Sequence, residues 1–224
     1  MNGKKTLMAL LAFLGILLAI QPAEEWVVGQ TGKYTPVSHA NVTTEGGNVT
    51  NLNLSGNIST EKWAGFWGNV SGRIVLAPGI NQPMFFTWTW NSSRGGEVCA
   101  IAAASGFDWS GVRLVLASTI DSIWGFTGTD TDSAVNTLTS SCSVDVAGIP
   151  VSGSAGNFTG VGGFETCAIA DQSAPGAKSD VAFCVNITQN GNLFNGLTGD
   201  YELIAPTNEA AGQFETYYFW LELD

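Results

Sequence analysis

The residues of this chain that could carry out a reaction are few and widely spaced. His39 is the single histidine among 224 residues, and neither a GxSxG nucleophile elbow nor an HExxH zinc motif occurs. Glycoside hydrolysis needs two carboxyl groups on either side of the scissile bond, and the spacing of the 19 acidic residues selects no such pair. We therefore expect a protein that is not an enzyme, with a secreted glycoside hydrolase as the competing interpretation.

Acidic residues provide the candidate metal ligands. The loop GTDTDSAVN contains Asp130 and Asp132, and Asp108 or Asp121 could add oxygen ligands from neighbouring loops. Carboxylate oxygens are typical ligands of calcium, although the loop lacks the glycine and glutamate positions of an EF-hand. The competing interpretation is that these aspartates form turns and helix caps. No other cofactor is expected.

Aromatic residues provide a candidate binding surface. Trp63, Phe66 and Trp67 lie in a glycine-bracketed stretch that we expect to bend. Rings that project from a bend could form a platform for glycans or for a partner protein, which predicts a carbohydrate-binding module as the alternative function. The other interpretation is that these large side chains fill the core.

Four cysteines, an even number in a chain with an export signal, predict two disulfides with three possible connectivities. A zinc site is disfavoured because the chain has no CxxC pair and His39 lies about 60 residues from the nearest cysteine. The apolar runs FETCAIAD and DVAFCVNIT would place Cys167 opposite Cys184 in an antiparallel hairpin. We therefore favour a bond between Cys167 and Cys184, which leaves Cys99 to pair with Cys142.

Glycosylation is suggested by the number of Asn-x-Ser/Thr sequons. Random placement would give about three, and the chain has eight, which indicates acceptor sites on an exported surface. The acceptor residues are Asn41, Asn48, Asn53, Asn57, Asn69, Asn91, Asn157 and Asn186.

The N-terminal residues have the order of a secretory signal. Lys4 and Lys5 precede an uncharged run over residues 7–20, and cleavage is expected after Ala23. The alternative is an uncleaved anchor, but the run is shorter than the roughly 20 residues that span a bilayer. We expect residues 1–23 to be a signal peptide and the mature protein to be extracellular or bound to the cell surface.

The charge of the chain limits its partners. Without residues 1–23, six basic and 19 acidic residues give a net charge of −13. A nucleic-acid partner is therefore not expected, because binding phosphates requires a positive surface.

Alternation of apolar and polar residues indicates strands through most of the chain. The runs NVTNLNLSG, GRIVLAPG, FFTWTWN, EVCAIAAA, VRLVLAST and TYYFWLEL are among them, each bounded by turn residues. Residues 24–224 are therefore predicted to form one all-β domain, an antiparallel β-sandwich or jelly roll of nine or ten strands with little helix. Trp88, Trp90 and Trp220 are expected in its core. Short helical turns are expected only at residues 132–138 and 60–66.

The segments WAGFWGNVSG, DSAVNT and TYYFWLEL resemble, in the same order, a group of uncharacterised secreted archaeal surface proteins. The resemblance implies an archaeal extracellular or cell-surface protein and carries no assigned site residues. We therefore expect a secreted, N-glycosylated structural or adhesive protein that could contact glycans or other surface proteins.

A looser likeness is to extracellular filament subunits of the donor-strand type, in which a mature N-terminal strand inserts into the next subunit. Residues 24–37, EEWVVGQTGKYTPV, could serve as that strand and mediate self-assembly. The competing interpretation is that they form the first strand of the protein's own sheet.

Overall fold

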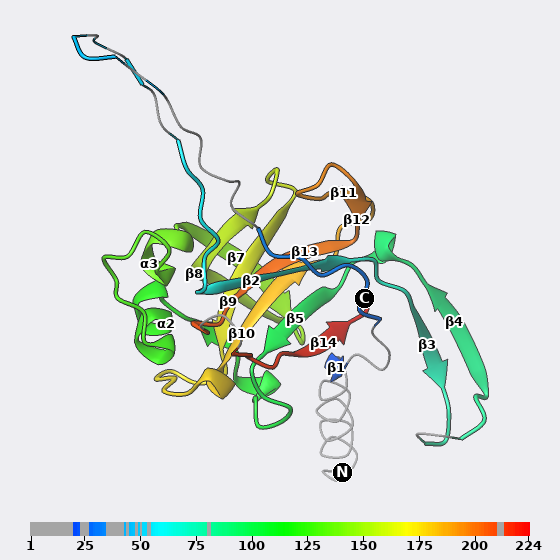
Figure 1. The fold of residues 1–224 in the computed structure, drawn as a ribbon. Coiled ribbons are helices and arrows are strands. Elements are labelled where there is room, and N and C mark those ends of the chain that lie inside the picture. The colour runs from blue at the N-terminus through cyan, green and yellow to red at the C-terminus, as the bar shows by residue number, and fades with distance from the viewer. Residues whose placement is uncertain are drawn as a thin grey trace.

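The computed structural model describes residues 20–22, 27–34, 43, 45–47, 49, 51–52, 55–79, 82–209 and 213–224. Its strands form antiparallel sheets in an all-β, sandwich-like arrangement, which confirms the predicted fold class (Figure 1). Asn41, Asn48 and Asn53, and most of the predicted signal peptide, lie outside the described residues.

A large antiparallel sheet forms the centre of the molecule. Its strands, in spatial order, are β1 (Ile20–Pro22), β14 (Tyr218–Glu222), β5 (Glu97–Ile101), β10 (Val181–Asn186), β9 (Phe164–Ala170), β8 (Ile149–Thr159) and β7 (Ser140–Val146), and β6 (Arg113–Leu114) pairs with β9. Every residue of β5 is buried, and so is nearly every residue of β9 and β10. Strands buried on both faces read as continuous apolar runs, as EVCAI and FETCAIA do. The sheet is therefore covered on both faces.

The first face of this sheet is covered by a second layer. Strand β13 (Tyr201–Pro206) pairs with β2 (Trp63–Gly68), and β13 contacts β9 and β10 of the large sheet. Helices α2 (Ala117–Trp124) and α3 (Ala134–Thr137) complete the covering (Figure 1). The first core lies between these layers and includes Phe183, Ile120 and Leu203, none of which is exposed.

The second face carries a smaller core that contains all four cysteines. Strand β7 alternates, with Cys142, Val144 and Val146 buried and the residues between them exposed. Phe107, Trp109 and Trp220 pack against this core as partly buried side chains, and the rings of Trp109 and Trp220 lie 5.5 Å apart.

A hairpin projects from the body of the molecule (Figure 1). It consists of β3 (Gly72–Leu76) and β4 (Phe86–Trp90), which pair only with each other among the described strands. Trp90 is 3% exposed, as expected for the core, whereas Trp88 is 48% exposed because it lies on the projecting part. The core prediction is therefore confirmed for Trp90 and wrong for Trp88.

Short elements complete the fold. They are β11 (Gly191–Asn192), β12 (Thr198–Gly199), and the 3-10 turns η2 (Ser92–Arg94), η3 (Trp109–Gly111) and η4 (Lys178–Asp180). The predicted turn at residues 132–138 is confirmed as α3, but residues 60–66 run into strand β2 instead. The predicted strand NVTNLNLSG is also wrong in its described part, where no strand occurs and Leu52 is 55% exposed.

Candidate functional site

Both disulfides lie in the second core, and their connectivity differs from the favoured one. The bonds are Cys99–Cys184 and Cys142–Cys167. The predicted hairpin is present, with Cys184 opposite Cys167, but β10 also pairs with β5, where Cys99 lies opposite Cys184 in register. A cysteine on a central strand has two cross-strand neighbours, so the hairpin alone could not decide the partner.

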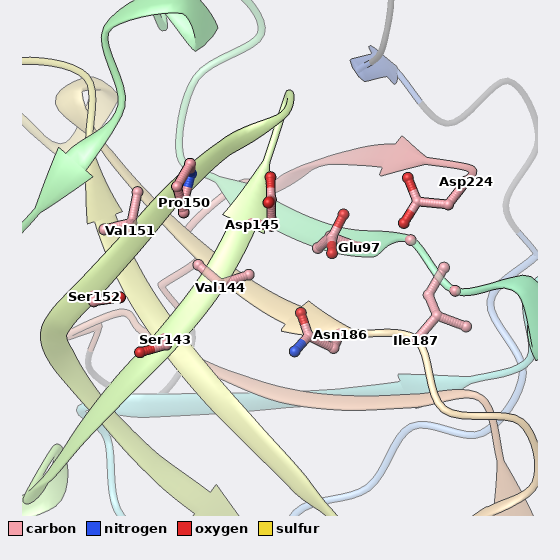
Figure 2. Close-up of a pocket in the computed structure, with 12 residues that line it drawn as sticks. Glu97, Ser143, Val144, Asp145, Pro150, Val151, Ser152, Asn186, Ile187 and Asp224 are labelled. Carbon is pink, nitrogen blue, oxygen red and sulfur yellow. The ribbon is translucent and has the colours of Figure 1, made fainter.

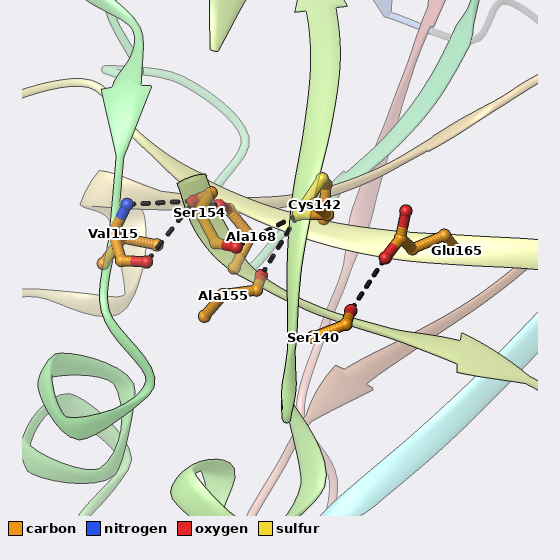
Figure 3. Close-up of a disulfide and its surroundings, with 8 residues drawn as sticks. Val115, Ser140, Cys142, Ser154, Ala155, Glu165 and Ala168 are labelled. Carbon is orange, nitrogen blue, oxygen red and sulfur yellow. Dashed lines mark hydrogen bonds between the residues drawn. A yellow bond between two sulfur atoms is a disulfide. The ribbon is translucent and has the colours of Figure 1, made fainter. Parts of the chain in front are cut away.

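The Cys142–Cys167 bond passes over strand β8, which lies between β7 and β9 in the sheet (Figure 3). Gly156 of β8 is opposite Cys167, and a Cβ atom there would lie 2.6 Å from the sulfur of Cys142 and 2.7 Å from the carbonyl oxygen of Thr166. Such contacts are too short for any side chain, so glycine at this position makes room for the disulfide.

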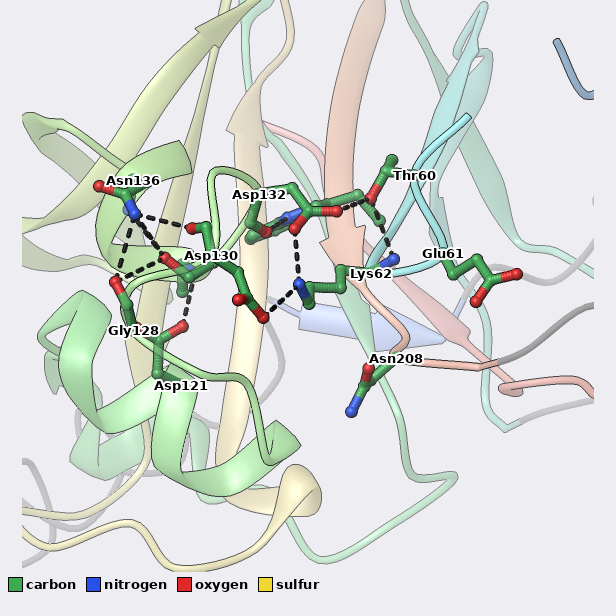
Figure 4. A network of polar contacts seen from close by, with 12 residues as sticks. Thr60, Glu61, Lys62, Asp121, Gly128, Asp130, Asp132, Asn136 and Asn208 are labelled. Carbon is green, nitrogen blue, oxygen red and sulfur yellow. Dashed lines mark hydrogen bonds and ion pairs between the residues drawn. The ribbon is translucent and has the colours of Figure 1, made fainter. Parts of the chain in front are cut away.

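The predicted calcium ligands Asp130 and Asp132 bind a lysine instead (Figure 4). The Nζ of Lys62 donates to a carboxylate oxygen of Asp130 at 2.8 Å and of Asp132 at 2.6 Å. The Oγ1 of Thr60 donates to the other oxygen of Asp132 at 2.6 Å. The hydrogen bonds to Asp130 and Asp132 raise the pKa of Lys62, and the hydrogen bond from Lys62 lowers the pKa of Asp132. The ammonium group lies where a cation would have to lie.

The two aspartates proposed as additional ligands bond backbone amides. Asp121 accepts from the N–H of Ala134 at 2.5 Å, at the start of α3. Asp108 accepts from the N–H of Ser110 at 2.9 Å and caps η3. Asp121 thus belongs to the same polar network as Asp130 and Asp132 (Figure 4), but among the described residues the four aspartates do not form a group with the spacing of metal ligands.

The predicted aromatic platform lies on a regular strand, β2, and not on a bend. Trp63, Phe66 and Trp67 are partly buried and pack against the first core. The Nε1 of Trp63 donates to the carbonyl oxygen of Asp132 at 2.7 Å, and the ring of Trp67 lies 6.0 Å from that of Phe194. This placement argues against a sugar-stacking role for the three rings.

The described sequon residues differ in their access to solvent. Asn57, Asn69, Asn91 and Asn186 are exposed. Asn157 is half-buried, and its Nδ2, the atom to which a glycan would be attached, donates to the carbonyl oxygen of Thr137 at 2.5 Å. The amide of Asn157 is therefore engaged in the fold.

The structure also reveals a carboxylate cluster that the sequence did not predict. Glu97 begins β5, Glu222 ends β14, and Asp224 follows two residues later. Leu221 pairs with Val98 across these strands, and the same register brings Glu222 beside Glu97. Carboxylate oxygens of the three residues lie within 4.8 Å of one another. A charged residue at the end of two otherwise apolar strands is the one sequence signal that could have indicated this cluster.

Glu97 and Asp224 of this cluster line an open groove of about 380 Å³ (Figure 2). Glu97, Asp145, Asn186 and Asp224 line the groove together with glycines, serines and a few apolar side chains. Glu97 and Glu222 are each only 6% exposed, whereas Asp145 and Asp224 are exposed. Glu97 is thus a nearly buried acid that solvent can reach through the groove, whereas Glu222 lies behind it and does not line the groove.

The electrostatics of the cluster are unfavourable to ionisation. Burial, followed by the charges of Glu222, Asp224 and Asp145, raises the pKa of Glu97 to about 8. Burial also raises the pKa of Glu222, against the lowering effect of a 2.7 Å hydrogen bond from the N–H of Ala147. In the described part of the chain, ion pairs involve only Lys62 and Lys178, so no lysine or arginine there neutralises the cluster.

Three kinds of chemistry are open to such a cluster, namely proton sharing, cation binding and acid catalysis. Glycoside hydrolysis requires the sugar to enter between two carboxyl groups that are about 5 Å or more apart. Glu97 and Glu222 are hydrogen-bonded to each other, which leaves no space for a substrate between them. The described residues that line the groove include no aromatic ring on which a sugar could stack. The geometry favours a proton or a cation over a substrate.

Searches of protein-family models, of curated proteins and of solved structures find no match to this chain. No helix in the described ranges has the length and apolar character needed to cross a membrane. Two disulfides are typical of extracellular proteins.

Proposed function

We propose that this protein is a secreted, N-glycosylated structural or adhesive component of the cell surface that associates with further copies of itself and is not an enzyme. The disulfides support export to an oxidising compartment, where such bonds persist. The exposed sequon residues Asn57, Asn69, Asn91 and Asn186 support glycosylation of the same surface.

The observation that carries this proposal is the projecting β3–β4 hairpin. An isolated two-stranded hairpin is marginally stable in water unless it packs against something else. This one exposes a series of apolar side chains, with exposures of 39% to 81%, namely Ile74, Val75, Leu76, Met84, Phe85, Phe86 and Trp88. Its strands also pair with no other described strand, so their outer edges can accept a further strand.

Charge favours a second copy of this chain as the partner of the hairpin. The chain carries a net charge of −11, so most of its surface repels another copy. Between residues 72 and 90 the only charged residue is Arg73. The hairpin is therefore a surface on which two copies can approach with little repulsion and bury apolar side chains.

Residues 24–37 are the other candidate for the contact between copies. The part of this segment that the structure describes, residues 27–34, forms no strand, and Val27 and Val28 are 84% and 65% exposed. An unpaired apolar segment could add to the free edge of a hairpin in the next copy. In that arrangement the segment and the hairpin would be the two sides of one head-to-tail interface.

Sedimentation velocity of residues 24–224 over a range of concentrations tests the proposal. We expect oligomers for the native sequence and monomers for the double variant Phe85→Asp/Trp88→Asp, which places charges on the hairpin. The matched control is Val161→Asp, because Val161 is 62% exposed but lies in the turn after β8. A native protein that stays monomeric, or a hairpin variant that assembles as well as the control, would contradict the proposal. Deletion of residues 24–37 should also abolish assembly if that segment forms the other side.

A further inference from the structure

We propose that Glu97, Glu222 and Asp224 form a calcium-binding site at the end of the central sheet. This inference does not depend on self-association, because it concerns the groove beside β5 and not the hairpin.

The spacing of the three carboxylates fits calcium. Oxygen ligands lie 2.3–2.6 Å from a bound Ca²⁺, so two of them can be at most about 5 Å apart. One oxygen from each of the three residues satisfies this limit, since all lie within 4.8 Å of one another. Magnesium demands a strict octahedron and releases its waters reluctantly, so it is usually held by only one or two carboxylates, whereas calcium accepts several.

Glu97 supplies the observation that points to a ligand. Its side chain is more than nine-tenths buried and faces the groove (Figure 2). No backbone N–H, hydroxyl or basic side chain among the described residues donates to it, and its one hydrogen-bonding contact is the carboxyl group of Glu222. Two nearly buried acids that share one hydrogen bond and have no basic group beside them cannot both ionise without a cost, and buried charges in proteins are normally paired or bound to a metal. A cation in the groove would provide that partner.

The surroundings can complete the coordination shell. Calcium takes six to eight oxygen ligands, including amide carbonyls and water. Asp145 lines the same groove from β7 and can supply a further carboxylate oxygen. The groove is open to solvent, so water can fill the remaining positions.

The site also has a structural consequence. Glu97 lies in β5 and Glu222 in β14, which is joined on its other side only to the short strand β1. An ion bound by both residues would cross-link the first residue of β5 to the last residue of β14. Calcium is therefore expected to stabilise the folded protein, because a ligand that binds only the native state shifts the unfolding equilibrium.

Calorimetric titration of calcium chloride into chelator-treated protein at pH 7.5, together with thermal unfolding, tests the site. We expect one equivalent of calcium to bind per chain and to raise the melting temperature. Glu97→Gln should abolish binding, and Asp224→Asn should weaken it by about tenfold or more, because calcium affinity follows ligand charge. Asp224 is exposed, so the second variant keeps the test valid if the first fails to fold.

The matched control is Asp130→Asn, which removes an acid from the lysine-bound cluster and should leave calcium affinity unchanged. The proposal is overturned if millimolar calcium produces neither heat nor stabilisation, or if Glu97→Gln and Asp224→Asn bind as the native protein does. Equal affinity for magnesium would also overturn the assignment to calcium.

Discussion

Two groups of carboxylates in this protein differ in how their charge is compensated. Asp130 and Asp132 are half-buried on the surface and share the ammonium group of Lys62. Glu97 and Glu222 are nearly buried, and no described basic residue pairs with them. The group that the sequence identified as a metal site thus carries its own cation, and the group that it did not identify lacks one.

The difference lies in what each group joins. Lys62 precedes β2, and the two aspartates precede α3, so the ion pair fixes two loops that cover the first core (Figure 4). The glutamates end two paired strands beside an open groove. The Lys62 salt bridge joins its elements without an ion from solution, whereas in the cluster without a cation the contact between the strands depends on protons or ions from solution.

The largest expected effect is a dependence of stability on pH that arises from Glu97. Its pKa in the folded protein is about 8, against an ordinary value of 4.5, so the folded state holds this proton more tightly than the unfolded state. The stabilisation is complete below about pH 4.5 and is lost as the pH rises through about 8. Denaturant unfolding in chelating buffer between pH 5 and 9 should show a loss of up to about 4 kcal/mol.

The control for this effect is Glu97→Gln, which cannot ionise. Its free energy of unfolding should change much less over the same pH range, and it should exceed that of the native protein at pH 9. A native protein whose stability is constant from pH 5 to 9 would show that the groove already compensates the charge without added ions.

A smaller effect is expected from Lys62→Met, which would make the first group resemble the second. Asp130 and Asp132 would then face each other without a cation, because each loses its hydrogen bond to Nζ. The melting temperature in chelating buffer should fall, and added calcium should restore part of the loss. Lys33→Met is the control, since it makes the same charge change at an exposed position before the folded core. If both variants respond to calcium alike, the Lys62 ion pair has no special role.

The sequence predicts the class of fold because the pattern of apolar and polar residues along a short run indicates which side chains of a strand are buried. The runs EVCAI, FETCAIA and VAFCVN became central strands, and the turn at residues 132–138 became α3. Helix α2 escaped prediction although Ile120 and Trp124 have helical spacing and Gly125 ends the helix with φ +69. β-Branched residues and the surrounding strand-like runs outweighed those local signals.

The wrong or missing predictions concern features that depend on the tertiary arrangement of the strands. Cys184 has a cysteine opposite it on each side, and only the position of β5 beside β10 brings Cys99 within bonding distance. The same holds for Glu97 and Glu222, which come from distant parts of the chain and meet through the β5–β14 register. Trp88 has the alternation of a core residue, but its hairpin projects from the body.

The smallest expected effect is the most direct test of the comparison. An Asp→Asn substitution should change the free energy of unfolding with opposite sign in the two groups. In chelating buffer at pH 8, Asp132→Asn should lower the stability because it weakens the contacts with Lys62 and Thr60. Asp224→Asn should raise it, because the charge of Asp224 opposes ionisation of Glu97 and Glu222. Each change should be below about 1 kcal/mol, since the side chain of Asp132 is 39% exposed and Asp224 is exposed, so that solvent screens both charges. With calcium added, the native protein should become more stable than Asp224→Asn, because the native carboxylate then binds the ion. No such reversal is expected for Asp132→Asn. Changes of the same sign at both positions would mean that the two groups are compensated alike.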